Sequence, residues 1–362
     1  MQYHQIFPQS FKEQYSQNDV IDFVMTFEGQ SLVAGSVRLT GNLQLQKGTT
    51  AIDVYNADVV GFDPLIGIHG AYQAITCSTD LGGVLENNSS YPLYCKAKAT
   101  ASAANSQYAT QSADTAELRC GNKSTSITKA LAINNKRDQQ VSFAMKPDVA
   151  FNKSSDHIPF SKSGVCKMTV RLATNNQFIY GTGNDGTYQY IISDFQLHYR
   201  TVPMKGSKSL QFDTVVSISN TIESNLTSLA NRVPATVQSA SCVFIREKNI
   251  NQPIPNSLAL EVPPDVSRVE FSFNDSTTQY VTFVLEDREE ILYNYQRSWG
   301  FNQKNNITLD ELDHEGRGYG IGLPFGQLID MTNQKFGLTL ESGISNVDKY
   351  SITMFFRGVV GI

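Results

Sequence analysis

Charge is scarce in this sequence. Only 17% of the 362 residues are Asp, Glu, Lys or Arg, against about 25% in an average soluble chain, and Ser, Thr, Asn and Gln fill the polar positions. Long solvated helices held by ion pairs are therefore not expected. The net charge is −5 and no domain-scale basic tract occurs. Broad nucleic-acid capture requires clustered Lys and Arg, so we expect no direct nucleic-acid binding.

Long apolar runs are also missing. No stretch of about 18 consecutive apolar residues occurs, so no transmembrane helix is predicted. The first residues, MQYHQIFPQSFKEQYSQ, have neither a cationic start nor a continuous apolar core, and they therefore do not predict a secretory signal. We expect a protein that is made and kept soluble.

The cysteines lack the patterns of disulfide or metal frameworks. An odd number of cysteines cannot close into a full disulfide set, no CxxC pair occurs, and the five histidines stand apart from them. No Gly-x-Ser-x-Gly motif supports a nucleophile either. We predict no catalytic residue, no cofactor and no metal site. Buried free thiols are expected at Cys77, Cys95, Cys120, Cys166 and Cys242.

Alternation of apolar and polar residues dominates what is present. Residues 20–28, VIDFVMTFE, place every second side chain from Ile21 onward on one apolar face, which is the period of a half-buried strand. In residues 188–200 the alternation changes phase at Ser193–Asp194, as a β-bulge requires. Similar patterns predict further strands at 32–45, 66–77, 141–150, 165–173, 209–218, 237–246, 258–262, 266–273, 279–286, 335–341 and 349–357.

Helical spacing is confined to a few short segments. Residues 219–232 carry apolar side chains at helical spacing between a capping Ser219 and the stop signal Pro234. Two further helices are predicted at 91–104 and 286–297.

These elements predict an all-β fold with a few short helices, arranged as two jelly-roll β-sandwiches in tandem. Each half has seven or eight strands and is long enough for an eight-stranded jelly roll with long connections. No letter-for-letter repeat relates the halves, so the expected duplication is one of architecture. We expect an N-terminal arm at 1–19, a first jelly roll at 20–203 and a second at 204–362.

The segment 66–103 carries a family resemblance. It runs from a small-residue start through a strand, a glycine turn and a polar segment to Asn-Ser-Ser-Tyr-Pro and a short helix. This order resembles the first jelly roll of double jelly-roll major capsid proteins of tailless icosahedral DNA viruses and membrane-containing phages, with Asn88, Tyr91 and Pro92 at the matching positions. The opening strands at 20–45 and a helix directly after the first strand of the second half agree with that family.

The resemblance implies a structural and non-enzymatic role. It implies a homotrimeric capsomer of pseudo-hexagonal outline that tiles an icosahedral shell, contacts neighbouring capsomers and a penton or vertex protein, is assembled in the host cytoplasm and resides in the virion. The low charge density independently suits wet, hydrogen-bonded contacts between copies, because strongly sticky patches promote wrong assembly.

The N-terminal tail adds a sharper hypothesis. Tyr3, Phe7, Phe11 and Tyr15 recur every four residues and would form one aromatic stripe on a helix, although Pro8 opposes a helix. Such a ridge would rest against an internal membrane surface or a neighbouring capsomer. The alternative is a partly extended arm that packs against its own subunit or trimer.

Two functions of other classes stay open. A glycan-acting enzyme would need convergent carboxylates. A glycan-binding module or a minor receptor-binding vertex protein would need exposed aromatics around Trp299, which otherwise is a core or interface anchor. The first candidate site for an enzyme or a divalent cation is the acidic cluster Asp310, Glu311, Asp313, His314 and Glu315. The cluster matches no calcium loop and runs into a glycine-rich connection, which favours a solvated loop.

Overall fold

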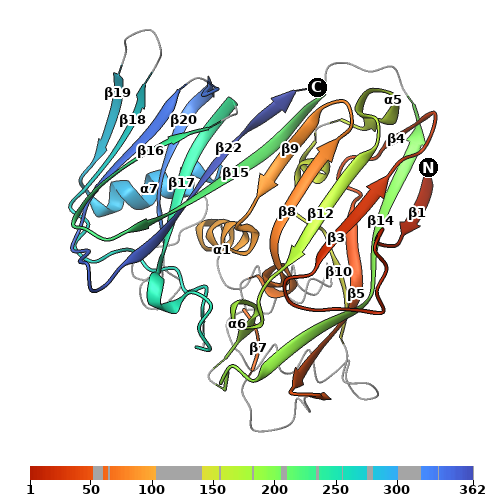
Figure 1. The fold of residues 1–362 in the computed structure, drawn as a ribbon. Helices are drawn as coiled ribbons and strands as arrows, with labels where there is room; N and C mark the ends of the chain where they lie inside the picture. The colour runs from red at the N-terminus through yellow and green to blue at the C-terminus, as the bar shows by residue number, and fades with distance from the viewer. Residues whose placement is uncertain are drawn as a thin grey trace.

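The chain forms two β-sandwiches that lie side by side, with helix α1 (Tyr91–Ser102) between them (Figure 1). The structure is a computed structural model. It describes residues 1–51, 60–63, 66–102, 141–154, 156–181, 183–204, 210–233, 236–254, 256–274, 280–300, 319–332 and 334–361.

The first sandwich has the jelly-roll order. Its principal strands are, along the chain, β1 (Gln2–Ile6), β3 (Val20–Met25), β5 (Arg38–Lys47), β8 (Tyr72–Thr79), β9 (Gly83–Asn88), β10 (Val141–Met145), β12 (Cys166–Leu172) and β14 (Tyr188–Pro203). One sheet pairs the first, eighth, third and sixth of these, and the other pairs the second, seventh, fourth and fifth. Short strands extend it: β2 (Gln14–Tyr15), β4 (Gln30–Leu32), β6 (Thr50–Ala51), β11 (Ile158–Pro159), and the separate pair β7 (Gly61–Phe62) and β13 (Ile179–Tyr180).

The second sandwich repeats this order. Its strands are β15 (Gln211–Ile222), β16 (Leu226–Arg232), β17 (Thr236–Arg246), β18 (Arg268–Asn274), β19 (Tyr280–Leu285), β20 (Ile321–Asp330), β21 (Lys335–Glu341) and β22 (Tyr350–Gly361). The sheets β15-β22-β17-β20 and β16-β21-β18-β19 again combine first, eighth, third and sixth with second, seventh, fourth and fifth. A helix follows the fifth strand in both halves: α1 after β9, and α7 (Arg288–Ser298) after β19. The expected duplication of architecture, and the all-β double jelly-roll fold, are confirmed.

One sheet runs through both sandwiches. Strand β15 of the second half pairs in parallel with β9 of the first at Val216 and Asn87, so the strands form the continuous order β20-β17-β22-β15-β9-β8-β12-β3. The buried apolar residues of both halves also form one connected cluster. The two sandwiches are therefore one packed body.

The alternation in the sequence explains the strands. In β3 the buried residues are every second one, as residues 20–28 predict. In the 16-residue strand β14, the register with β5 shifts between Ser193 and Gln196, and Asp194 has a positive φ of 51°. This confirms the predicted bulge, which keeps Ile192 and Phe195 both in the core.

The predicted helix at 219–232 is wrong. Strand β15 continues to Ile222, and β16 pairs along its whole length with β21, so sheet hydrogen bonds override a short helical spacing. Leu226, which would lie on the buried face of the helix, is 57% exposed. The expected helix directly after the first strand of the second half is wrong for the same reason, since β15 is followed by strand β16.

Other differences are local. The predicted strand at 66–77 begins as the 3-10 helix η1 (Gly67–Ala71), the one at 141–150 ends at Met145 before the one-turn helix α4 (Ala150–Lys153), and 258–262 forms no strand. Strand β20 has no counterpart among the predictions. Among the residues that the structure describes, the remaining short helices are α5 (Phe160–Ser163), α6 (Asn175–Phe178) and η2 (Glu247–Asn249). The helices predicted at 91–104 and 286–297 are confirmed as α1 and α7.

The N-terminal segment is extended, so the predicted helical aromatic stripe is wrong. Strands β1 and β2 both pair with β14, which satisfies the backbone of the tail without a helix and agrees with the alternative of an arm packed on its own subunit. Tyr3, Phe7 and Phe11 are exposed, whereas Tyr15 is buried. Because β1 is the first strand of the jelly-roll order, residues 2–6 belong to a sheet. The boundaries at 19/20 and 203/204 stay predictions.

The described cysteines are buried free thiols, as expected. Cys77, Cys95, Cys166 and Cys242 are unpaired and buried, and burial raises the pKa of the Cys166 thiol to about 12, which keeps it protonated and unreactive. Cys120 lies outside the described residues. None of the helices in the described ranges is long and apolar enough to cross a membrane.

Candidate functional site

The residues singled out for chemistry do not form a site within the described structure. The acidic cluster Asp310 to Glu315 lies outside the described residues, so an enzymatic or cation-binding role for it stays a prediction. Trp299 is only 2% exposed, which confirms a core anchor and removes the exposed platform that glycan binding needs. Across the described ranges, no group of three or more His, Cys, Asp or Glu is placed to hold a metal ion.

What the structure does build is a junction between the two sandwiches, with helix α1 at its centre. Pro92 occupies the first turn of α1, where proline is favoured, and Asn88 Oδ1 accepts a hydrogen bond from the Ser90 backbone N–H just before the helix. Small residues at Ala97, Ala99 and Ala101 let the helix pack closely, and all three are buried. A helix buried on several sides suits a position between two layers.

An aromatic cluster ties α1 to the second sandwich. Tyr94 of α1 lies with its ring centroid 5.6 Å from Trp299 and 5.8 Å from Phe355 of β22. Trp299 follows α7, and Tyr295 of α7 donates a hydrogen bond from its hydroxyl to the backbone oxygen of Ala97 over 3.2 Å. Aromatic contacts of this kind add about 0.5–1.5 kcal/mol per pair beyond the area that they bury. The two halves thus share an aromatic core.

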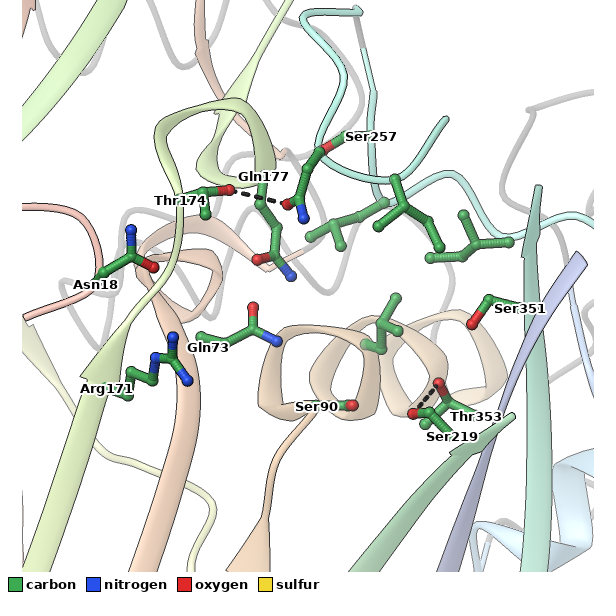
Figure 2. A pocket seen from close by; sticks show the side chains of 15 residues that line it. Asn18, Gln73, Ser90, Arg171, Thr174, Gln177, Ser219, Ser257, Ser351 and Thr353 are labelled. Carbon is green, nitrogen blue, oxygen red and sulfur yellow. Dashed lines mark hydrogen bonds between the residues drawn. The ribbon is translucent and has the colours of Figure 1, made fainter. Parts of the chain in front are cut away.

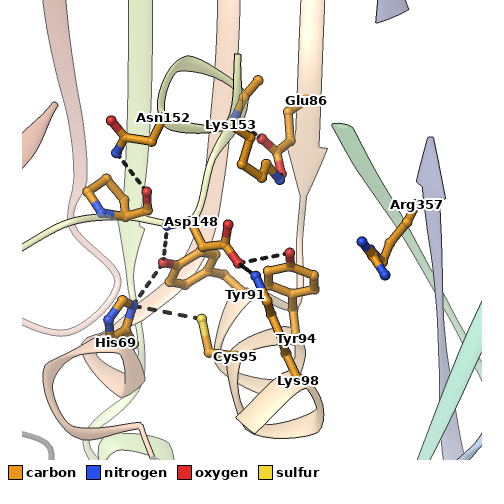
Figure 3. A network of polar contacts seen from close by, with 12 residues as sticks. His69, Glu86, Tyr91, Tyr94, Cys95, Lys98, Asp148, Asn152, Lys153 and Arg357 are labelled. Carbon is orange, nitrogen blue, oxygen red and sulfur yellow. Dashed lines mark hydrogen bonds and ion pairs between the residues drawn. The ribbon is translucent and has the colours of Figure 1, made fainter. Parts of the chain in front are cut away.

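Partly buried ion pairs lie beside α1 (Figure 3). The Asp148 carboxylate lies 2.5 Å from Lys98 Nζ and accepts a hydrogen bond of 2.9 Å from the Tyr94 hydroxyl. Burial by itself would raise the pKa of the Asp148 carboxyl, but the positive charges of Lys98 and Lys153 and these hydrogen bonds outweigh burial and hold that pKa far below its usual range. Asp148 is therefore a carboxylate at neutral pH.

A second ion pair connects β9 with α4. Glu86 lies 2.9 Å from Lys153 Nζ and accepts a hydrogen bond from the Ala150 backbone N–H. Burial raises the pKa of Glu86 despite the nearby Lys153. The pKa of Lys153 is raised because Glu86 and Asp148 outweigh the lowering effect of burial. Both pKa values are raised, which favours the charged form of Lys153 and disfavours the charged form of Glu86.

The contacts of Tyr91 show what the tyrosine of the Tyr91-Pro92 motif does in this fold. Its buried hydroxyl accepts a hydrogen bond of 3.0 Å from the Asp148 backbone N–H and lies 2.9 Å from His69 Nδ1. Cys95 Sγ lies 3.8 Å from the same ring nitrogen. Tyr91 therefore fixes α1 against η1 and against the segment that carries Asp148, which is a structural role.

The loop after η2 closes the junction from the second half. Asn251 accepts hydrogen bonds of 3.0 Å from Thr174 Oγ1 and from Asn176 Nδ2, and Ser257 Oγ donates one of 2.8 Å to the backbone oxygen of Asn176. A cavity of about 300 Å³ remains between these loops and the start of α1 (Figure 2). Its walls come from both sandwiches and include Gln73, Leu93, Arg171, Ser219, Leu258 and Thr353.

Sequence reasoning missed the charged members of the junction. No local sequence pattern predicts the two ion pairs, because the partners are far apart in the chain. Lys98 and Asp148 are 50 residues apart, and Glu86 and Lys153 are 67 residues apart. What the sequence does offer is a charged residue within a mostly apolar or small-residue segment, such as Glu86 in β9 and Lys98 in the alanine-rich helix. Such a residue indicates that a partner of opposite charge lies nearby in the fold.

A second feature is an aromatic edge at the N-terminus, which we call the N-terminal aromatic edge and define as Tyr3, Phe7 and Phe11. All three are exposed, and the rings of Phe7 and Phe11 meet edge to face with centroids 5.9 Å apart. Among the described strands, β1 pairs with β14 alone. An edge strand beside exposed aromatic rings is suited to contact another chain.

No family model matches the sequence, and no curated protein matches it. Solved structures do match. The Faustovirus major capsid protein aligns with a TM-score of 0.62 at 8% identity, over 100% of this chain and 90% of that chain. The Sputnik virophage structure aligns with a TM-score of 0.56 at 8% identity, over 99% and 85%. The mavirus major capsid protein aligns with a TM-score of 0.53 at 12% identity, over 98% and 86%.

These alignments span both sandwiches, in agreement with the strand order derived above. The chain therefore has the double jelly-roll fold of these viral major capsid proteins.

Proposed function

We propose that this chain is a major capsid protein whose copies form trimeric capsomers of pseudo-hexagonal outline that tile an icosahedral shell. The observation that carries the proposal is the repeat of one jelly-roll strand order in two sandwiches joined by a continuous sheet. Three copies around a threefold axis place six similar sandwiches in a ring, and closed rotational symmetry is the usual form of homo-oligomers.

A rigid junction is what such a ring requires. The angle between the two sandwiches sets the outline of the capsomer, and the shared sheet and the aromatic cluster around Tyr94 and Trp299 hold that angle. The ion pair between Lys98 and Asp148 fixes α1 within the first half. Dense packing transmits strain and resists deformation. The proposed role is accordingly structural and non-enzymatic, with residues 1–19, 20–203 and 204–362 as its parts.

The N-terminal aromatic edge is the surface that we assign to contacts between copies. Its rings are exposed in and just after β1, and the low charge of the chain leaves few like charges to repel a neighbour. In the proposed virion, assembled in the host cytoplasm, this edge contacts a neighbouring capsomer. The same edge would also contact two further partners, a penton or vertex protein and an internal membrane surface.

Light scattering after gel filtration tests the proposal. We expect the mass of a trimer for the wild type at micromolar concentration, together with larger assemblies as concentration rises. A monomer at every concentration, or a melting temperature that rises on addition of glycans, would contradict the capsid role. The doubly substituted Phe7→Ser/Phe11→Ser protein keeps β1 in place and is a sharper probe than deletion of the tail, which would remove a strand of the first sheet.

A further inference from the structure

A buried lysine joins the two halves. Lys96 Nζ, on α1, lies 2.5 Å from Asp63 Oδ2 and 3.2 Å from Asn256 Oδ1. The Lys96 and Asp63 side chains are 2% and 6% exposed. Asp63 directly follows β7 in the first half, whereas Asn256 lies between β17 and β18 of the second. One amine thus contacts a carboxylate of its own half and a side-chain amide of the other half.

A buried aromatic pair lies next to Asp63 along the chain. Phe62, next to Asp63 in the chain, is buried and stacks on Phe178 with ring centroids 4.9 Å apart. Burial, and in addition the charge of Asp63, raise the pKa of the Tyr180 hydroxyl. An ammonium group is poorly solvated in such surroundings, and a lysine desolvated next to a proton acceptor is an activated nucleophile.

We propose that Lys96 and Asn256 form an isopeptide bond that cross-links the two sandwiches, with Asp63 as the proton carrier. The Asp63 carboxylate takes a proton from the Lys96 ammonium, and the neutral amine attacks Cγ of Asn256. The bond from Nζ to Cγ forms, and the bond from Cγ to the amide nitrogen breaks, with its electron pair leaving on that nitrogen.

The protons balance through Asp63. The protonated carboxyl gives its proton to the departing nitrogen, and the attacking nitrogen releases a second proton to the carboxylate. Ammonia leaves and takes this last proton as ammonium, so Asp63 ends as a carboxylate and no oxidant or cofactor is consumed. General acid–base transfer of this kind contributes about 10²–10⁴-fold to a rate, and the fixed proximity of the groups contributes further.

The geometry needs one small adjustment. In the structure Nζ hydrogen-bonds the amide oxygen, whereas attack requires the face of Cγ. The χ2 torsion of Asn is broad, so rotation about it turns that face toward Nζ without movement of the backbone. The other two lysines of the junction are more exposed than Lys96, and in the described part of the chain Lys98 and Lys153 pair with Asp148 and Glu86 and contact no side-chain amide.

The intact mass of the purified full chain under denaturing conditions tests the bond. We expect the wild type to be lighter than the sequence mass by one ammonia. Lys96→Met and Asp63→Asn should both restore the full sequence mass, because one removes the nucleophile and the other removes the proton carrier. Lys98→Met, a change of the same kind on the same helix that breaks the ion pair with Asp148, should retain the loss of ammonia.

Peptide mapping of the wild type decides the question even where a variant fails to fold. Digestion should yield a branched peptide that contains both Lys96 and Asn256. A folded wild type with the full sequence mass would overturn the proposal. A mass lower by one water would overturn it too, since that product is an amide between Lys96 and Asp63 within one sandwich.

A protease site inserted after Met204 gives an independent readout on a gel. Cleavage of the cross-linked wild type should leave the two fragments joined under denaturing conditions, and cleavage of Asp63→Asn should separate them. Full separation of the wild-type fragments would contradict the cross-link. The bond closes a loop between residues 160 apart, so it strongly restricts the unfolded chain.

Discussion

Helices α1 and α7 occupy the same position in the strand order of their sandwiches, yet they are built differently. Helix α7 is capped by Asp287, which accepts a hydrogen bond of 2.8 Å from the Glu289 backbone N–H, and it has one buried face and one charged face. Helix α1 is buried almost throughout and its lysines are paired inside the junction. Both helices follow the fifth strand of their sandwich, so strand order does not explain the difference. The residues of α1 instead match its place between the two sandwiches.

The strongest test of this comparison removes the ring at which the two helices meet. Trp299→Ala should lower the free energy of unfolding by about 4 kcal/mol, because it empties a buried site between Tyr94, Tyr295 and Phe355. Tyr293→Ala, on the exposed face of α7, should cost below about 1 kcal/mol. Denaturant titration measures both. Equal losses for the two variants would refute the idea that α7 contributes to the junction through one face.

The next largest effect concerns the buried charges beside α1. Glu86→Ala should cost about 3 kcal/mol, because Lys153, whose side chain is only 16% exposed, then loses its salt-bridge partner. The control Glu223→Ala breaks an exposed pair of 3.0 Å with Lys349 in the second sandwich, and it should cost between 0 and about 1 kcal/mol. Urea unfolding of both variants checks the difference. A cost for Glu86→Ala as small as that of the control would show that the ion pair does not stabilise the junction.

The pH dependence sharpens the same point. The pKa of Asp148 is lowered in the folded chain, so its contribution to stability is present above the unfolded pKa of about 3.9 and is lost as the pH falls through the folded value. The raised pKa of Glu86 acts with the opposite sign, since its contribution is present below the unfolded value and is lost as the pH rises through the folded value. In Asp148→Asn, the melting temperature should therefore fall less steeply than in the wild type as the pH is lowered below about 5. An unchanged acid slope would contradict this assignment.

The smallest expected effect on stability lies at the N-terminal aromatic edge. Phe7→Ser/Phe11→Ser should change the free energy of unfolding by below about 0.5 kcal/mol, because both rings are exposed. The same variant should weaken self-association markedly in sedimentation experiments. Tyr15→Ser removes the buried aromatic ring of the same segment. This variant should lower the free energy of unfolding and leave the exposed rings that mediate self-association in place. Full self-association of the double variant would exclude this edge as a contact between copies.

The strands with clean alternation could be predicted from the sequence, and so could the bulge at Asp194. Strand β20 could not, because Pro324 and the positive φ of Gly326 interrupt its pattern where its register with β17 shifts. Strand β16 could not be predicted either, because the spacing of three between Leu226 and Leu229 also fits a helix. The junction itself depends on contacts between residues far apart in the chain, such as Glu86 with Lys153, and local patterns do not contain such pairings.

Electron microscopy of the concentrated wild-type protein tests the central claim most directly. The account predicts closed shells or hexagonal arrays, in which each capsomer has threefold symmetry and six sandwich-sized lobes. Single particles of one chain, with two lobes and no lattice at any concentration, would contradict it.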